Sequence, residues 1–124
     1  MYLKSYKELI VWQKSINLVK HVFLLTGRFP QSELYGIVSQ IRRAAVAIPS
    51  NIAEGYGRQS TKSYIQFLLI AYGSVLELET QLIIAKDLKM ADGKYFTDIE
   101  ALLLEVIKML NAMIGKMKNS SQQS

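Results

Sequence analysis

The chain of 124 residues contains no cysteine and only one histidine, His21. The absence of cysteine excludes disulfide frameworks, thiolate metal sites and cysteine nucleophiles, and it is compatible with a reducing cytosol. His21 has no evident orienting carboxylate for a Ser-His-Asp centre. No glutamate lies three residues before it, as the Glu-x-x-His pair of a di-iron bundle requires. We therefore expect no enzyme activity, no metal site and no cofactor.

Targeting segments and long apolar runs are also missing. The first residues lack the uninterrupted apolar stretch of a secretory signal. The longest apolar run, residues 67–76, has about half of the roughly 20 residues that a membrane span needs. We expect a soluble, cytoplasmic protein with no membrane partner.

Strand-like alternation is absent, and four segments instead repeat apolar residues at spacings of three and four. The rows predicted to face the core are Leu9, Trp12, Ile16, Val19, Phe23 and Thr26; Leu34, Val38, Ile41, Ala45, Ile48 and Ile52; Tyr64, Leu68, Ala71, Val75, Leu78, Leu82 and Ala85; and Ile99, Leu103, Val106, Leu110, Met113 and Met117. Four such segments with short connections predict an all-α, antiparallel up-down-up-down four-helix bundle. One domain is expected over residues 1–118, followed by a disordered polar tail over residues 119–124.

Capping signals place the helix starts. They are Ser5 with Glu8, Ser32, Ser60, and Thr97 with Glu100. The first helix is expected to stop at Gly27 and the second near residues 55–57, while Asp92-Gly93 marks the turn before the fourth.

Pro49 falls inside the second predicted helix. An interior proline removes one backbone hydrogen bond and costs roughly 3 kcal/mol unless the helix bends. The small residues Ala44, Ala45 and Ala47 leave room for such a bend. We expect one helix kinked at Pro49 rather than two helices.

The outer faces of the second and third helices carry unusual residues for a solvated surface. Opposite the core row of the third helix lie Leu69, Ile70, Gly73, Leu76 and Ile84, and opposite that of the second lie Gly36, Gln40, Arg43, Ala47 and Glu54. Burying each large aliphatic side chain contributes roughly 1.5 to 3 kcal/mol, and exposed apolar patches mark interfaces. We predict a homo-oligomer that uses both faces; the alternative is a solvated face with a few small residues.

Basic and aromatic residues gather around the second helix and the turn after it. Arg42, Arg43, Arg58 and Lys62 accompany Tyr56 and Tyr64, in a chain of net charge +5. Guanidinium groups bind phosphates and tyrosine rings stack on unpaired bases, so this mixture suits RNA. The alternative for Arg42 and Arg43 is a structural ion pair with Glu33 or Glu54.

A family resemblance extends over about residues 5 to 115. It rests on Tyr6-Lys7-Glu8-Leu9, Val11-Trp12-Gln13-Lys14, Phe29-Pro30, Glu33-Leu34-Tyr35-Gly36, all of residues 40–58, Ile70-Ala71-Tyr72-Gly73-Ser74 and Glu77-Leu78-Glu79-Thr80-Gln81-Leu82. These segments resemble the four-helix-bundle proteins named for open reading frames in intervening sequences of bacterial 23S ribosomal RNA genes. Ala47, where serine is usual, and Ser63, where glutamate is usual, depart from the family pattern.

The resemblance implies a cyclic homo-oligomer, a pentamer, associated with ribosomal RNA or ribosomes. Bundles similar to these serve as accessory proteins of retroelement reverse transcriptases and hold nucleic acid on a basic ring surface. Two hypotheses follow. Either the chain is a non-enzymatic RNA-binding oligomer, or it is a scaffold whose partner is another protein and whose arginines hold the subunits together.

Overall fold

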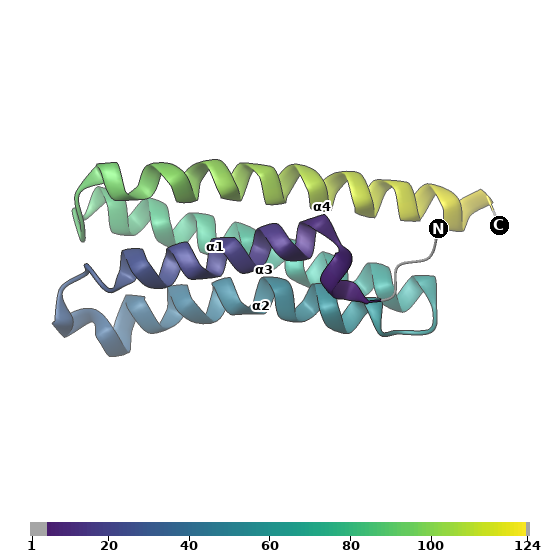
Figure 1. Cartoon of the computed structure of the whole chain (residues 1–124), viewed down its shortest axis with the longest axis horizontal. Coiled ribbons are helices and arrows are strands. Elements are labelled where there is room, and N and C mark those ends of the chain that lie inside the picture. The colour runs from purple at the N-terminus through teal and green to yellow at the C-terminus, as the bar shows by residue number, and fades with distance from the viewer. Residues whose placement is uncertain (1–4, 124) are drawn as a thin grey trace.

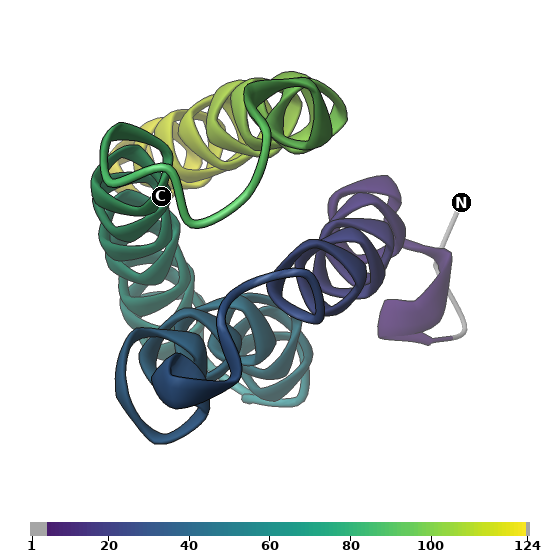
Figure 2. The same cartoon turned by 90° about the vertical axis from the view of Figure 1, so that its left-hand side faces the viewer.

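The computed structural model describes residues 5–123 and is all-α over that range. Its elements are η1 (Tyr6–Glu8), α1 (Ile10–Thr26), η2 (Gln31–Glu33), η3 (Leu34–Val38), α2 (Ser39–Tyr56), α3 (Thr61–Asp87), η4 (Gly93–Phe96) and α4 (Thr97–Gln123). Each long helix runs back along the one before it (Figure 1). Viewed end-on, the four helices surround one core, with α1 opposite α3 and α2 opposite α4 (Figure 2). The predicted four-helix bundle is confirmed.

The core rows predicted for the last three helices are largely confirmed. Fully buried side chains include Ile41 and Ile48 of α2, Leu78 of α3 and Val106 of α4. The exceptions lie at the ends of the rows, where Leu34 is exposed and Tyr64, Met113 and Met117 are only half-buried.

The row predicted for α1 is wrong by one position. The buried residues of this helix are Val11, Ser15, Leu18, Val22, Leu25 and Thr26. Of the predicted row only Thr26 is buried, while Trp12, Ile16 and Val19 are half-buried and Phe23 is exposed. Moving one residue along a helix turns the face by about 100°, and α1 carries apolar residues on both faces. Periodicity alone cannot choose between two such rows.

Ser60 and Ser5 both act as N-caps, but Ser60 caps a long helix and Ser5 caps only a short one. The hydroxyl oxygen of Ser60 accepts the backbone N–H of Ser63 at 3.1 Å and starts α3 as predicted. The hydroxyl oxygen of Ser5 accepts the N–H of Lys7 at 3.1 Å, but it caps only η1. The backbone is extended at Leu9, and α1 begins after it.

The other two predicted caps are wrong. Ser32 lies within η2 and Thr97 has helical backbone angles, φ −58° and ψ −49°. The chain enters α4 through η4, whose N-cap is Asp92; its carboxylate accepts the N–H of Lys94 at 3.0 Å. Glu100, predicted to complete a capping box, instead pairs with Lys86 at 3.0 Å.

The helix α2 is continuous through Pro49 and ends at Tyr56, within the predicted range. The bend at Pro49 stays a prediction.

Before α2, the backbone departs from helical geometry at Gly36, with φ −108° and ψ −113°, inside the π-helical turn η3. At the C-terminal end of the chain, α4 continues to Gln123. The sequence analysis predicted a disordered tail from residue 119.

A glycine brings α2 and α3 together. Gly55 is buried, and a Cβ atom there would lie 2.8 Å from Cβ of Phe67 and 3.1 Å from the ring of Tyr64. Real Cβ atoms do not approach so closely, so only glycine permits this packing. The close approach of the end of α2 to the start of α3 depends on this glycine.

Candidate functional site

At one end of the bundle α1 begins, α2 ends, α3 begins and α4 ends (Figure 1). The residues at and next to these helix ends include several lysines and an arginine. We call the following residues the basic end: Lys7, Arg58, Lys62, Lys116 and Lys118. All five are exposed, and the acidic side chains at this end of the described chain are Glu8 and Glu54. The surplus of positive charge is therefore local rather than spread over the molecule.

Arg58 is oriented by two neighbours. One guanidinium nitrogen lies 3.8 Å from a carboxylate oxygen of Glu54, and the guanidinium carbon lies 4.6 Å from the centre of the Phe67 ring. Both members of the ion pair are about half exposed, so the pair contributes at most about 1 kcal/mol. A guanidinium group has five N–H donors, which leaves Arg58 able to bind a phosphate.

Two tyrosines, Tyr56 and Tyr64, are close to Arg58 and Lys62 in the sequence. The rings of Tyr56 and Tyr64 meet edge to face, with centroids 6.2 Å apart. Burial, with a smaller effect of Tyr56, raises the pKa of Tyr64 to about 12. The Tyr64 hydroxyl therefore stays protonated at neutral pH.

The predicted basic cluster is divided in two by the structure. Arg42 and Arg43 lie on α2, 14 and 13 residues before its last residue, Tyr56, and Arg58 follows the end of that helix. The two arginines are therefore roughly 20 Å from that end along the helix axis. Nε of Arg42 donates to Oγ1 of Thr26 at 2.9 Å, and its guanidinium covers the Phe23 ring at 4.6 Å. Arg42 is thus held against α1, while Arg43 is exposed.

The ion pairs predicted for Arg42 and Arg43 do not form among residues 5–123. Glu54 pairs with Arg58, which follows the end of α2, and not with Arg43. Arg43 is 11 residues before Glu54, about 16 Å along the helix, too far for a contact within one chain.

The outer face of α3 is apolar and open to solvent in the single chain. We call Leu69, Ile70, Gly73, Leu76 and Ile84 the α3 outer row. Its four aliphatic side chains are between 38% and 51% exposed. A Cβ atom at Gly73 would have nothing within 4 Å, so no contact within the chain requires a glycine there. On α2, Gln40, Arg43 and Glu54 are exposed as predicted, and Ala47 is half-buried; Gly36 is half-buried in η3.

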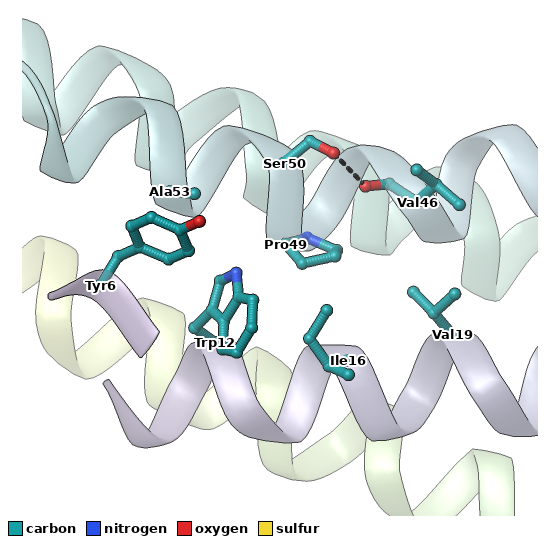
Figure 3. A pocket seen from close by; sticks show the side chains of 8 residues that line it. All are labelled: Tyr6, Trp12, Ile16, Val19, Val46, Pro49, Ser50 and Ala53. Carbon is teal, nitrogen blue, oxygen red and sulfur yellow. Dashed lines mark hydrogen bonds between the residues drawn. The ribbon is translucent and has the colours of Figure 1, made fainter. Parts of the chain in front are cut away.

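Sequence reasoning missed a groove between α1 and α2. Figure 3 shows the side chains that line it: Tyr6, Trp12, Ile16 and Val19 face Val46, Pro49, Ser50 and Ala53. The groove has a volume of about 320 Å³. A second hollow continues from Val19 to Lys20, Phe23 and Leu24. We call the two together the α1–α2 groove. The α1 side of the groove is the apolar row that the sequence pattern assigned to the core. This row was the sequence feature from which the groove could have been predicted.

The α1–α2 groove is lined mainly by apolar side chains. The Ser50 hydroxyl donates to the carbonyl oxygen of Val46 at 2.8 Å. Tyr6 and Trp12 meet edge to face with ring centroids 5.3 Å apart. The groove therefore suits apolar side chains of a partner rather than a polar ligand.

Among residues 5–123 no group of three His, Cys, Asp or Glu side chains could hold a metal ion. Nδ1 of His21 lies 2.9 Å from the carbonyl oxygen of Asn17. The helix α3 is long and apolar enough to cross a membrane by length and composition alone, with a mean hydropathy of 1.5 over its best window. In the bundle the core row of α3 packs against the other helices. The exposed aliphatic side chains of the α3 outer row account for part of the rest of its hydropathy.

Comparison with known proteins agrees with this architecture. No curated protein matches the chain. A crystal structure of a protein of unknown function from the S23 ribosomal protein family of Bacteroides thetaiotaomicron VPI-5482 superposes with a TM-score of 0.78 at 24% identity, covering 85% of this chain and 98% of that one. Because the identity is below 25%, this similarity is evidence for the fold alone. The family model described as 23S rRNA-intervening sequence protein matches residues 7–112, and the chain belongs to that family.

Proposed function

We propose that the protein is a non-enzymatic, cytoplasmic homo-oligomer that binds RNA through the basic end. The observation that carries the proposal is the local excess of five exposed basic side chains over two acidic ones where four helix ends meet. Exposed Lys and Arg side chains neutralise phosphates without reading sequence, which suits a structured RNA. The family's connection with 23S ribosomal RNA genes makes ribosomal RNA the first candidate.

Assembly supports this function in two ways. The α3 outer row leaves four aliphatic side chains in water, and burying each of them contributes at most roughly 1.5 to 3 kcal/mol. A cyclic assembly would also repeat the basic end once per subunit and multiply the net charge of +5. A pentamer is the size that the family resemblance implies.

A second function is favoured by the α1–α2 groove. Its apolar lining is of the kind that receives side chains of another protein. In this alternative the protein is an interaction scaffold or an accessory subunit, for example of a reverse transcriptase, and does not recognise RNA itself.

Fluorescence anisotropy with a labelled ribosomal RNA fragment, measured across a salt series, tests the proposal. We expect binding whose log affinity falls linearly with log salt, because released counterions drive it. The double variant Arg58→Gln/Lys62→Gln should bind about tenfold more weakly and with a shallower slope. The matched control Lys108→Gln removes an exposed charge in the middle of α4 and should change affinity less.

Two results would favour the scaffold instead. One is the absence of RNA binding at about 50 mM salt, where phosphate contacts are strong. The other is an equal loss of log affinity per charge removed in Lys108→Gln and in the double variant, because the effect would then follow total charge and not the basic end.

A further inference from the structure

Two long apolar surfaces are left uncovered by residues 5–123, besides a hollow between α1 and α4 that Leu9, Val11, Met109 and Met113 line. One is the α3 outer row and the other is the α1–α2 groove. They lie on different sides of the molecule, since the groove is between α1 and α2 and α1 is opposite α3 (Figures 1 and 2). Each surface could meet its own copy across a two-fold axis, or each could meet the other.

We propose that the α3 outer row of one copy packs into the α1–α2 groove of the next, so that the copies join head to tail. The inference rests on the homo-oligomer part of the proposed function and is independent of RNA binding. Such a heterologous contact repeats without a two-fold axis and closes as a ring when the rotation between copies allows it.

Charge separates the head-to-tail arrangement from the two-fold one. Lys20 lines the groove and Arg42 borders it over the Phe23 ring, and no acidic side chain lines it in the described chain. The α3 face carries Glu77 beside Leu76 and Thr80, with no cation paired to its carboxylate among residues 5–123. Groove against groove would bring cations together, whereas groove against α3 brings Glu77 towards Lys20 and Arg42.

Shape agrees with charge. The groove follows α1 from Trp12 to Phe23, about 16 Å, and the α3 outer row extends from Leu69 to Ile84, about 22 Å. A helix laid in a groove is a recurring mode of recognition, with anchors at spacings of three and four. Gly73 lies in the middle of the row with open space around it, so a partner backbone can approach there closely.

Two blocking variants test the contact by mass measurement. Gly73→Lys places a long cation on the α3 row, where no side chain of the same copy is within 4 Å. Val46→Glu places a carboxylate on an exposed position of the groove. Each variant alone should be a 14.1 kDa monomer in light scattering, while wild type has a mass of three or more chains. An equimolar mixture of the two, at hundreds of micromolar, should form a dimer, because one intact row then meets one intact groove.

Matched controls lie on α4. Gly115→Lys makes the same change at another helical glycine with open space around it, and Leu104→Glu places a carboxylate at another exposed aliphatic position. Both should keep the wild-type mass. The contact is overturned if Val46→Glu keeps the wild-type mass or if the mixture stays monomeric while the wild type is oligomeric. A monomeric wild type would remove the homo-oligomer as well.

Disulfide trapping gives an answer that does not depend on the stability of these variants. Because the chain has no cysteine, introduced thiols are the only ones present. The double variant Ser50→Cys/Gly73→Cys should form a ladder of cross-linked chains on mild oxidation, and each single variant should not. A cross-linked dimer from Gly73→Cys alone would show two α3 helices meeting across a two-fold axis and would overturn the proposal.

Discussion

The helices α3 and α4 are alike inside the bundle and different outside it. Both have 27 residues, and both bury a row of Leu, Ile and Val side chains in the same core. On its outer side α3 exposes Leu69, Ile70, Leu76, Ile83 and Ile84. In the described part of α4 the exposed large apolar side chain is Leu104, next to charged residues such as Glu105 and Lys108.

The comparison shows which residues the solvent-exposed face of a helix can carry in this fold. The outer face of α4 shows that the bundle tolerates charge at such positions without loss of the core. The apolar outer face of α3 is therefore not a requirement of the fold, and a contact outside the single chain gives it a physical reason. The two helices can be tested against each other by matched substitutions.

The largest effect is expected where the helices are equivalent. Leu78→Ala on α3 and Leu110→Ala on α4 each remove a fully buried side chain. Each should lower the free energy of unfolding by about 2 to 5 kcal/mol, because transfer and cavity costs add. Urea unfolding followed by circular dichroism measures both. A loss below about 1 kcal/mol at either position would contradict the core described here.

The second comparison separates the outer faces. Leu76→Asn on α3 should weaken self-association at least about tenfold, equivalent to roughly 1.4 kcal/mol. Leu104→Asn on α4 should leave association unchanged, because no proposed contact involves it. Sedimentation equilibrium measures the two dissociation constants, and circular dichroism checks that both variants fold. Equal effects at the two positions would mean that the α3 face has no special role.

The smallest effect concerns the junction between the two helices. Lys89, after α3, has a left-handed backbone with φ 57°. The backbone N–H of Lys89 donates to the carbonyl oxygen of Lys86, and the backbone N–H of Met90 donates to the carbonyl oxygen of Ala85, both at 3.0 Å. This pair of hydrogen bonds ends α3 in a Schellman motif. Glycine adopts this conformation without the steric cost of a Cβ, so Lys89→Gly should stabilise the fold by about 1 kcal/mol.

Thermal unfolding of Lys89→Gly against wild type measures this gain. The control Lys108→Gly introduces the same residue into the regular helix α4 and should destabilise the protein by about 1 kcal/mol. A destabilised Lys89→Gly would contradict the left-handed conformation at this position.

The sequence predicted the bundle because, in the last three helices, the row with unbroken spacings of three and four is the row that the core buries. For α2, α3 and α4 the residues at spacings of three and four are those that the core buries. For α1 the prediction failed because Trp12, Ile16 and Val19 form a second row beside Leu18 and Val22. Choosing between the rows requires knowing which face the neighbouring helices cover, and that information is tertiary.

The candidate site was predictable in part. Arg58 and Lys62 were identified from their residue types, and they lie at the end where helix termini gather further cations. Arg42 was grouped with them because the four positions are close in sequence. A helix converts that proximity into separation along its axis, and Arg42 instead contacts Thr26 on α1. The turn at Lys89 gave no sequence signal, since lysine has no preference for a left-handed backbone.

The close packing at Gly55 has a consequence for the size of the assembly. Because Phe67 packs directly against this glycine, a side chain at position 55 would push the start of α3 away from α2. If copies join through the α3 outer row and the α1–α2 groove, such a shift would also change how far each subunit is rotated from the one before it. A substitution at Gly55 would then change the number of subunits that completes a circle.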